Sequence, residues 1–531
     1  MGPALAVATA VKGLGVVAAV GAAGGALLLP QPRLRAVSAL IALALTPVLL
    51  VGELWDSPQM LSLRAHGAIA AAAVVLGLAA IGALAWVLRR HPWLFVALAV
   101  ATLPFRIPLE SGGQSANLLL PLYVVVAAGV VAYAWNRLVG RRESEAAAAG
   151  NGAGDPGSWR DPAPGWIEKA LVVFVVLYAV QSLYSADFET ALKNVAFFYV
   201  PFMLMFRLLT SVHWTRRVVV TSAMLAVGLS IMFAAVGFVE YATRHIFWNQ
   251  KVIASNEFES YFRVNSLFFD PNIYGRFLAM VMIGLAVTLL WPRRTREVAL
   301  VSITLAVLWA AMVLSFSQSS FAALLAGLGV LAALRWSWKP VLLAGGAVAA
   351  IGIGIVLLAP GAVNLRATSL HAFDRASSGR LDLLRGGLAM FGDRPLQGYG
   401  SGAFAKQFRK RENVGSRTAA TASHTIPVTV AAEQGIVGLA AYVFLLVAAF
   451  ALVFRGLGEL RQRVPPLRLV SRAYVAAAFT GLVLHTLLYA AFLEDPITWA
   501  LLAAGVVFSR PEPSALRPSS ASARAQSPSS A

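Results

Sequence analysis

The sequence predicts an all-α fold: a polytopic membrane helix bundle of about 13–15 transmembrane helices, with one large extracytoplasmic loop containing short helices. The 531-residue chain is 59% hydrophobic and only 13% charged, which is too apolar for a soluble protein. Apolar runs of about 20 residues, each enough to cross a hydrocarbon core of about 30 Å, recur along most of its length. These runs do not alternate apolar with polar residues, which argues against a β-barrel.

The apolar runs predict membrane spans at residues 4–29, 36–52, 66–88, 92–109, 117–136, 166–184, 191–210, 217–240, 267–291, 298–314, 319–334, 340–359, 425–454, 472–492 and 496–509. Short loops rich in Lys and Arg fall on alternate sides of successive spans, so one face collects them and is predicted to be cytoplasmic. The net charge of +19 therefore mostly reflects the basic loops on the predicted cytoplasmic face of the membrane. Because the charge sits in scattered pairs beside the membrane, we expect membrane lipid and no nucleic acid as a partner.

Composition divides the chain into four parts. Residues 1–140 form a predicted N-terminal transmembrane bundle, and residues 141–165, rich in Gly, Ala, Pro and charge, form a flexible cytoplasmic linker. Residues 166–510 form the larger transmembrane domain, and residues 511–531 form a disordered cytoplasmic tail. The chain has no cysteine, so it has no disulfide, thiolate metal site or thiol nucleophile.

The segment 360–423 is the most basic loop on the predicted outer face. It carries ten Lys and Arg residues against four acidic ones, on the side where positive charge is normally sparse. Arg forks match phosphate oxygens bidentately and stay charged at any working pH. The loop is therefore predicted to hold an anion outside the cytoplasm.

A short helix is predicted inside this loop, over residues 378–391. Leu381, Leu384, Leu388 and Phe391 fall on one helical face, and Ser378 can cap the start. The helix would lie on the bilayer surface or on the bundle.

Arg380 stands in the first turn of this predicted helix, where the helix dipole disfavours a cation. Its position suggests a partner anion, and a salt bridge to Asp374 or Asp382 is the structural alternative. The run 393–402 follows, with Arg394, Tyr399 and several glycines. Glycine permits positive φ and close approach of a ligand, although a tight turn without a ligand is the more common meaning.

A second constellation opens the span after residue 266. Asp270 before Pro271 predicts an N-cap and a first helical position. Arg263 then lies just outside the membrane, and Arg276 lies inside the helix together with Asn272. A charge inside a span suggests function by default. The structural alternatives are snorkelling or pairing with Asp270 for Arg276, and contact with lipid phosphate for Arg263.

His424 opens a later span. A helix N-terminus lowers an imidazole pKa, and the neutral ring is the form that a general base needs. The alternative is that His424 only caps or orients the helix. Glu433 follows on the same helix, in the run 433–438, whose glycines permit close helix packing.

Cofactor signatures are absent from the sequence. The other histidines lack the paired spacing of a zinc site, and no Walker A loop, dinucleotide fingerprint or nucleophile elbow occurs. We therefore expect no metal and no cofactor.

The order of these motifs resembles the O-antigen ligase and polymerase superfamily of bacterial membrane glycosyltransferases. The resemblance covers roughly residues 190–455 and rests on an ordered set of segments: Arg263 with Asp270-Pro271-Asn272, the serine-rich run 315–319, Ser378-Gly379-Arg380, the run 394–400, and His424 with the run 433–439.

The resemblance implies a glycan donor on undecaprenyl pyrophosphate and a glycan, lipid or protein acceptor. Transfer would occur at the outer face of the cytoplasmic membrane, without a metal or a nucleotide. By motif position, Arg263 and Arg380 match the family's pyrophosphate-binding arginines, and His424 matches its proposed base. Thr425, Gln318 and Asp270 depart from the family's usual Asn, Arg and Asn at the corresponding positions.

We predict that the catalytic residues are His424, Arg380 and Arg263, and that the substrate-binding residues are Arg276, Arg394, Asn272, Tyr399 and Glu433. The sequence leaves open whether the enzyme is a ligase or a polymerase. A transporter or flippase of lipid-linked oligosaccharides is the alternative from another class. It would require charges at mid-depth of the spans and two related halves, and no internal repeat is evident. A scaffold for an envelope complex is the third hypothesis.

Overall fold

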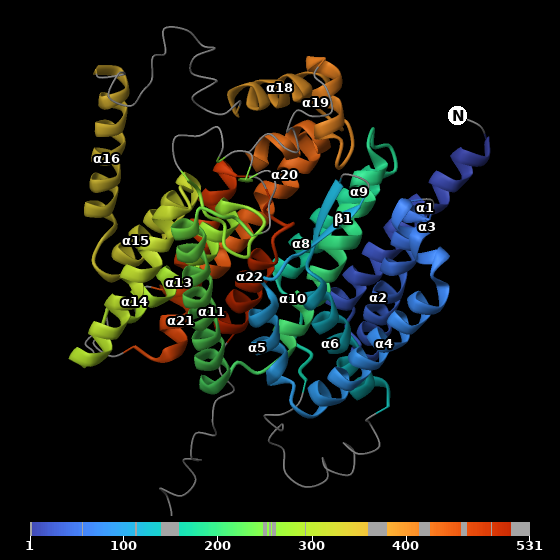
Figure 1. Ribbon diagram of the computed structural model, residues 1–531, viewed down its shortest axis with the longest axis horizontal. Coiled ribbons are helices and arrows are strands. Elements are labelled where there is room, and N and C mark those ends of the chain that lie inside the picture. The colour runs from blue at the N-terminus through green and yellow to red at the C-terminus, as the bar shows by residue number, and fades with distance from the viewer. Residues whose placement is uncertain are drawn as a thin grey trace, which may run out of the picture.

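The computed structural model confirms an all-helical membrane bundle (Figure 1). The structure describes residues 3–55, 57–111, 114–139, 159–247, 252–253, 256, 262–291, 294–358, 380–413, 425–457, 465–489 and 491–510. Within these ranges, eleven helices are long and apolar enough to cross a membrane, and two further apolar helices are shorter.

The helices of the first half are α1 (Pro3–Leu28), α2 (Pro32–Leu54), α3 (Pro58–Ala65), α4 (Gly67–Arg90), α5 (Trp93–Thr102), α6 (Leu120–Leu138), α8 (Trp166–Ser182), α9 (Phe188–Asn194), the π-helix η1 (Val195–Tyr199), α10 (Val200–Ser211) and α11 (Arg216–Thr243). The helices of the second half are α13 (Pro271–Thr288), α14 (Thr295–Leu314), α15 (Gln318–Arg335), α16 (Trp338–Leu358), α18 (Arg380–Asp393), α19 (Phe404–Glu412), α20 (Ile426–Phe454), α21 (Leu467–Leu488) and α22 (Pro496–Ser509).

The predicted span 92–109 is helical only in its first part. Helix α5 has 10 residues, and an antiparallel hairpin follows, in which β1 (Ile107–Ser111) pairs with β2 (Gln114–Leu118). Pro104 explains the break, because proline lacks an N–H and disfavours helical geometry in the residue before it. The polar residues of the hairpin then find backbone partners in a sheet.

One large hydrophobic core connects the two halves of the chain, and a smaller cluster lies between α18, α19 and α20. Helices α1, α2, α4 and α6 pack on one another, and α8 and α10 join them through contacts with α1. In the second half α15 packs on both α13 and α21, and α21 packs on α22. The division at residues 141–165 stays a prediction, and most of that linker lies outside the described residues.

Two glycines explain the close packing of α15 on α21. A Cβ at Gly481 would lie 2.5 Å from the Ala323 carbonyl oxygen, and one at Gly327 would lie 3.2 Å from the Ala477 carbonyl oxygen. Small residues let membrane helices approach closely enough for van der Waals contact along their length.

One end of the bundle gathers the elements that form the site described below. Here α13, α15 and α20 begin and α21 ends, and Thr425 Oγ1 donates to the Leu487 carbonyl at 3.1 Å. Helices α18 and α19 lie over α20 at the same end (Figure 1). We call this the site end.

Helix α18 confirms the short helix predicted in the basic loop, but its packing face differs from the predicted one. Leu383 and Met390 are buried, whereas Leu388 is 52% exposed. Gly386 and Gly387 decide the face, because they let the rings of α19 approach the backbone of α18: a Cβ at Gly386 would lie 2.4 Å from the Phe408 ring. Periodicity alone does not show this effect.

Candidate functional site

Arg276 is the centre of the site. It is 1% exposed, and its Nη2 forms an ion pair at 2.5 Å with Oδ2 of Asp495, which is 2% exposed. Arg276 therefore pairs with the start of α22 and not with Asp270, which caps α13 by accepting from Asn272 N at 2.7 Å. Its Nε and Nη1 are buried and have no hydrogen-bond partner among the described residues.

A serine cluster surrounds the start of α13. Ser317 is the N-cap of α15, and its hydroxyl donates to Asn272 Oδ1 at 2.9 Å. Ser320 lies 2.7 Å from the Ser317 hydroxyl and donates to the Asn272 carbonyl at 3.2 Å. Gly275 makes this approach feasible, because a Cβ there would lie 2.7 Å from the Ser320 hydroxyl. The serine-rich run thus fixes Asn272 through both its side chain and its backbone.

Arg263 lies against the same serine run. Its Nε donates to the Ser315 carbonyl at 3.2 Å, and Asn256 holds its backbone with two hydrogen bonds of 3.0 Å. The structure therefore brings Arg263, Asn272 and Arg276 around the first turns of α13, as the sequence suggests.

His485 approaches this cluster from α21. It is fully buried, and its Nε2 lies 3.1 Å from the Ser319 hydroxyl. Its Nδ1 has no hydrogen-bond partner within the described part of the chain. A histidine inside a span suggests function by default.

Arg106 adds a third cation from the segment between α5 and β1. Burial and the neighbouring Arg276 guanidinium lower the pKa of Arg106, and Asp495 and Tyr489 act in the opposite direction. Tyr489 hydrogen-bonds to Asp270, and burial raises the pKa of the Tyr489 hydroxyl. The site end thus holds several interacting charges away from water.

Glu494 precedes Asp495 in the turn between α21 and α22. Burial raises the pKa of the Glu494 carboxyl, and the Arg106 guanidinium lowers it to a smaller extent. This carboxyl therefore keeps its proton to a higher pH than a free glutamate does.

Glu433 and the run 393–402 form the neighbouring wall. Glu433 is 7% exposed, and its two carboxylate oxygens accept from Gly402 N at 2.9 Å and Phe404 N at 3.0 Å. Gly435 breaks the helical geometry of α20 with φ 65° and ψ −163°. A Cβ there would lie 2.3 Å from the Leu396 carbonyl oxygen, so this glycine faces protein backbone.

Arg394 and Tyr399 lie together on this run. The Arg394 guanidinium lies 4.6 Å from the centre of the Tyr399 ring, and the Tyr399 hydroxyl donates to Asp393 Oδ2 at 3.3 Å. Gly400 also packs on backbone, because a Cβ there would lie 2.3 Å from Ser185 Cα. The glycines of the run therefore serve close packing, and the substrate contacts predicted for Arg394 and Tyr399 stay a prediction.

Two predicted catalytic residues are not placed with their side chains. Arg380 is the first residue of α18, and its side chain is not described. His424 lies outside the described residues, next to Thr425, the N-cap of α20. Their roles stay predictions.

Sequence reasoning missed the residues that complete the cluster around Arg276. A signal was present in two cases: Asp495-Pro496 repeats the Asp-Pro helix start seen at residues 270–271, and His485 is a polar residue inside a span. The residues missed are Arg106, His485, Tyr489, Glu494 and Asp495. As for metals, the described residues contain no group of three or more His, Cys, Asp or Glu side chains that could hold one.

Comparison with known families bears on the second half of the chain. Residues 303–443 match the family model described as O-antigen ligase. This segment is an O-antigen ligase domain. It confirms the resemblance seen in the sequence and lies within the range of roughly 190–455 that carried it. No curated protein matches the chain.

The O-antigen ligase domain covers only part of the site. It includes the serine cluster at the start of α15, helix α18 and Glu433. Arg263 and Arg276 precede the matched residues, and Asp495 follows them. The chain is therefore a multi-pass membrane protein with an O-antigen ligase domain, whose candidate site draws on flanking helices.

Proposed function

We propose that this protein is a membrane glycosyltransferase that moves or polymerises a glycan from an undecaprenyl-pyrophosphate donor onto an acceptor hydroxyl, in the biosynthesis of cell-surface polysaccharide. The observation that carries the proposal is Arg276, buried beside Arg263 and Arg106 at the site end, with guanidinium donors still available. Family membership of residues 303–443 supports a lipid-linked glycan as the substrate.

The chemistry needs cations at the leaving group. The acceptor oxygen attacks the anomeric carbon while the bond between that carbon and the phosphate oxygen breaks. Negative charge then develops on the pyrophosphate, and preorganised arginines stabilise it strongly where water is excluded. We assign this role to Arg263, Arg276 and Arg380, which would take the place of a divalent metal.

A base must take the proton of the acceptor hydroxyl. We assign this to His424, which precedes Thr425, the N-cap of α20, in the sequence, because a helix N-terminus favours a neutral imidazole. Asn272, Arg394 and Tyr399 are proposed to contact the glycan or the phosphates. Glu433 is proposed to act on substrate through the segment that its carboxylate holds at Gly402 and Phe404.

The position of the charges favours an enzyme over a flippase. Arg276 stands five residues after the start of α13, Asp495 caps the start of α22, and His485 lies three residues before the end of α21. These groups lie near one end of the spans, where a reaction at the membrane surface needs them. A carrier of lipid-linked glycan would place them nearer mid-depth.

We propose that the site end faces outward and the opposite end faces the cytoplasm, as the basic loops predict. The chain has no native cysteine, so single cysteines can test this. Leu396→Cys at the site end is 72% exposed, and Lys339→Cys is an exposed position near the start of α16. An impermeant maleimide should label only Leu396→Cys on intact cells, and labelling of Lys339→Cys alone would invert the topology.

The functional test is transfer from a purified lipid-pyrophosphate glycan donor in membranes. Arg263→Ala should abolish transfer without lowering the melting temperature, and Arg263→Lys should rescue it poorly, because lysine lacks the bidentate fork. Arg296→Ala is the matched control, since this exposed arginine lies in the first turn of α14, at the opposite end of the bundle. Full activity of Arg263→Ala would refute the assignment. Product length on gels separates a ligase from a polymerase.

A further inference from the structure

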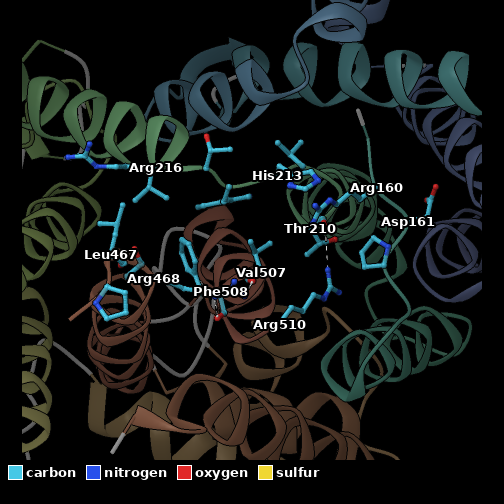
Figure 2. A pocket seen from close by; sticks show the side chains of 17 residues that line it. Arg160, Asp161, Thr210, His213, Arg216, Leu467, Arg468, Val507, Phe508 and Arg510 are labelled. Carbon is cyan, nitrogen blue, oxygen red and sulfur yellow. Dashed lines mark hydrogen bonds between the residues drawn. The ribbon is translucent and has the colours of Figure 1, made fainter. Parts of the chain in front are cut away.

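A second polar cavity lies at the opposite end of the bundle. It has a volume of about 730 Å³ and sits where α10 and α22 end and α11 and α21 begin (Figure 2). Helix α21 has 22 residues, and at about 1.5 Å per residue it spans roughly 33 Å from this cavity to the site end. The cavity is therefore separate from the candidate active site.

The charge of the cavity is strongly positive. Four arginines from four segments line it, together with one described acidic residue, Asp161. That carboxylate is already neutralised, because it pairs with Arg137 at 2.7 Å and with Arg207. The lining arginines, seen around the cavity in Figure 2, are Arg160, Arg216, Arg468 and Arg510.

Two of the arginines build the wall. Arg468 Nε donates to the Phe508 carbonyl at 2.9 Å, and its Nη2 donates to the Val507 carbonyl at 3.0 Å, so it caps the end of α22. Arg510 donates to the Thr210 carbonyl at 3.5 Å and pairs with Glu168 at 3.3 Å. Both guanidinium groups are thereby held in fixed positions on the cavity surface.

The other two arginines have donors available. The side chains of Arg160 and Arg216 form no hydrogen bond or ion pair with the residues that the structure describes. Burial and, to a smaller extent, the Arg160 guanidinium lower the pKa of the nearby His213 imidazole. An anion bound beside Arg160 would offset the repulsion between its guanidinium and a protonated His213.

The helix termini reinforce this preference. Helix α11 begins at Arg216 beside the cavity, with Thr215 as its N-cap, and α21 begins at Leu467, also in the lining. A helix N-terminus carries partial positive charge and exposed N–H groups, which favour a bound anion.

An apolar groove adjoins the cavity and indicates what kind of anion fits. The groove has a volume of about 490 Å³ and shares Arg510 with the cavity. Its other lining residues are mostly apolar and come from the start of α8, the second half of α20 and the end of α22. A cationic cavity next to an apolar groove matches a phosphate headgroup that carries an acyl chain.

We propose that this cavity binds the phosphate of an anionic phospholipid, with Arg160 donating to the phosphate oxygens, Arg216 adding positive charge at the start of α11, and an acyl chain in the groove beside Arg510. Basic pockets between transmembrane helices are suited to such headgroups. The site is independent of the proposed glycan donor, because it lies at the other end of α21. A soluble phosphate shares the headgroup chemistry but has no use for the groove.

Native mass spectrometry of the purified full-length protein tests the site, with phosphatidylglycerol and phosphatidylcholine added separately. Phosphatidylglycerol should bind at least about tenfold more tightly. Arg160→Gln should weaken its binding about tenfold, as expected for loss of one charge-assisted hydrogen bond. Arg216→Gln should weaken it by a smaller factor, because it removes only a nearby charge. Arg217→Gln is the matched control: it removes the same charge from the same turn of α11, but its guanidinium lies 4.7 Å from the Trp93 ring, and Arg217 is not among the cavity-lining residues.

Three results would overturn the proposal. Equal affinity for the two lipids would show that the negative charge of the headgroup does not determine binding. Equal effects of Arg216→Gln and Arg217→Gln would show that the lipid does not bind in the cavity. Inorganic phosphate that binds as tightly as phosphatidylglycerol and displaces it would indicate a soluble anion site. Arg160→Gln keeps the test available if Arg216→Gln fails to fold, because the exposed Arg160 side chain has no partner among the described residues.

Discussion

Arg276 of α13 and Asp495 at the start of α22 form a buried ion pair that joins two helices far apart in the sequence. The pair has a second function in the fold, because Asp495 Oδ1 also accepts from Ile497 N at 2.9 Å and caps α22. Removing the charge of Asp495 without removing the cap therefore isolates the ion pair.

Asp495→Asn should lower the free energy of unfolding by about 3–5 kcal/mol, because it leaves the Arg276 charge buried without compensation. Asparagine keeps the cap, since it is as good an N-cap as aspartate. Unfolding in detergent would measure the effect, with Asp187→Asn, the N-cap of α9, as the control. Equal losses in the two variants would mean that the ion pair contributes nothing beyond capping.

Ser319→Ala should destabilise the protein by about 1–3 kcal/mol, because His485 Nε2 would lose its partner in a buried position. Ser471→Ala is the control on the same helix as His485, since within the described part of the chain its hydroxyl bonds only to the Leu467 carbonyl one turn earlier. Its unfolding midpoint should change little. A Ser319→Ala midpoint as high as that of the control would show that the His485 contact is dispensable.

Gly435→Ala should destabilise the protein by at least about 1–3 kcal/mol, because its φ of 65° and ψ of −163° suit glycine alone. The close Leu396 carbonyl, 2.3 Å from a Cβ at this position, adds to the cost. Gly228→Ala in α11 should act in the opposite direction, stabilising by up to about 1 kcal/mol, since nothing lies within 4 Å of its Cβ position. Parallel melting curves of the two variants decide whether the break in α20 is required.

Glu494 predicts a dependence of stability on pH. Because the folded-state pKa of Glu494 is raised, the folded protein binds its proton more tightly than the unfolded chain does. The free energy of unfolding should therefore fall as pH rises from the ordinary Glu pKa of about 4.3 through the raised value. Glu494→Gln should melt above the wild type at neutral pH and equal to it near pH 4. A constant difference across this range would exclude Glu494 as the source.

Arg106→Gln should reduce transfer from the lipid-pyrophosphate donor by about 10–100-fold if Arg106 completes the cationic site with Arg276. The loss should appear in kcat/KM, because the guanidinium is proposed to stabilise the leaving pyrophosphate. Arg296→Ala, in the first turn of α14, again provides the control for a general loss of charge. Unchanged kcat/KM would limit Arg106 to a structural role.

Local features of this chain could be predicted from sequence. Asp270 caps α13 as the Asp-Pro pair predicts, and α18 forms where apolar spacing predicts a helix. Both depend on neighbours within a few residues, where propensity and capping act. The face of α18 is wrong in the prediction, because Gly386 and Gly387 select the packing surface through contacts with α19.

Tertiary partners could not be predicted in this way. The sequence indicates that Arg276 is a charge inside a span, but its partner Asp495 belongs to another helix and no periodicity connects the two. The sequence predicts a span that includes Arg106, because the apolar run continues past Pro104. In the structure, α5 ends before Pro104. The proximity of Arg263, Asn272 and Arg276 could be predicted, because all three lie in one short segment of the sequence.

The pairing of Arg276 with Asp495 limits how separable the O-antigen ligase domain is from the rest of the chain. Residues 303–443 contain neither partner, and Arg106 comes from still further away. Exchange of that domain alone between two relatives would therefore leave the cationic cluster behind. A chimaera that inherits a complete reaction centre must take its crossover points before Arg106 and after Asp495, which amounts to most of the protein.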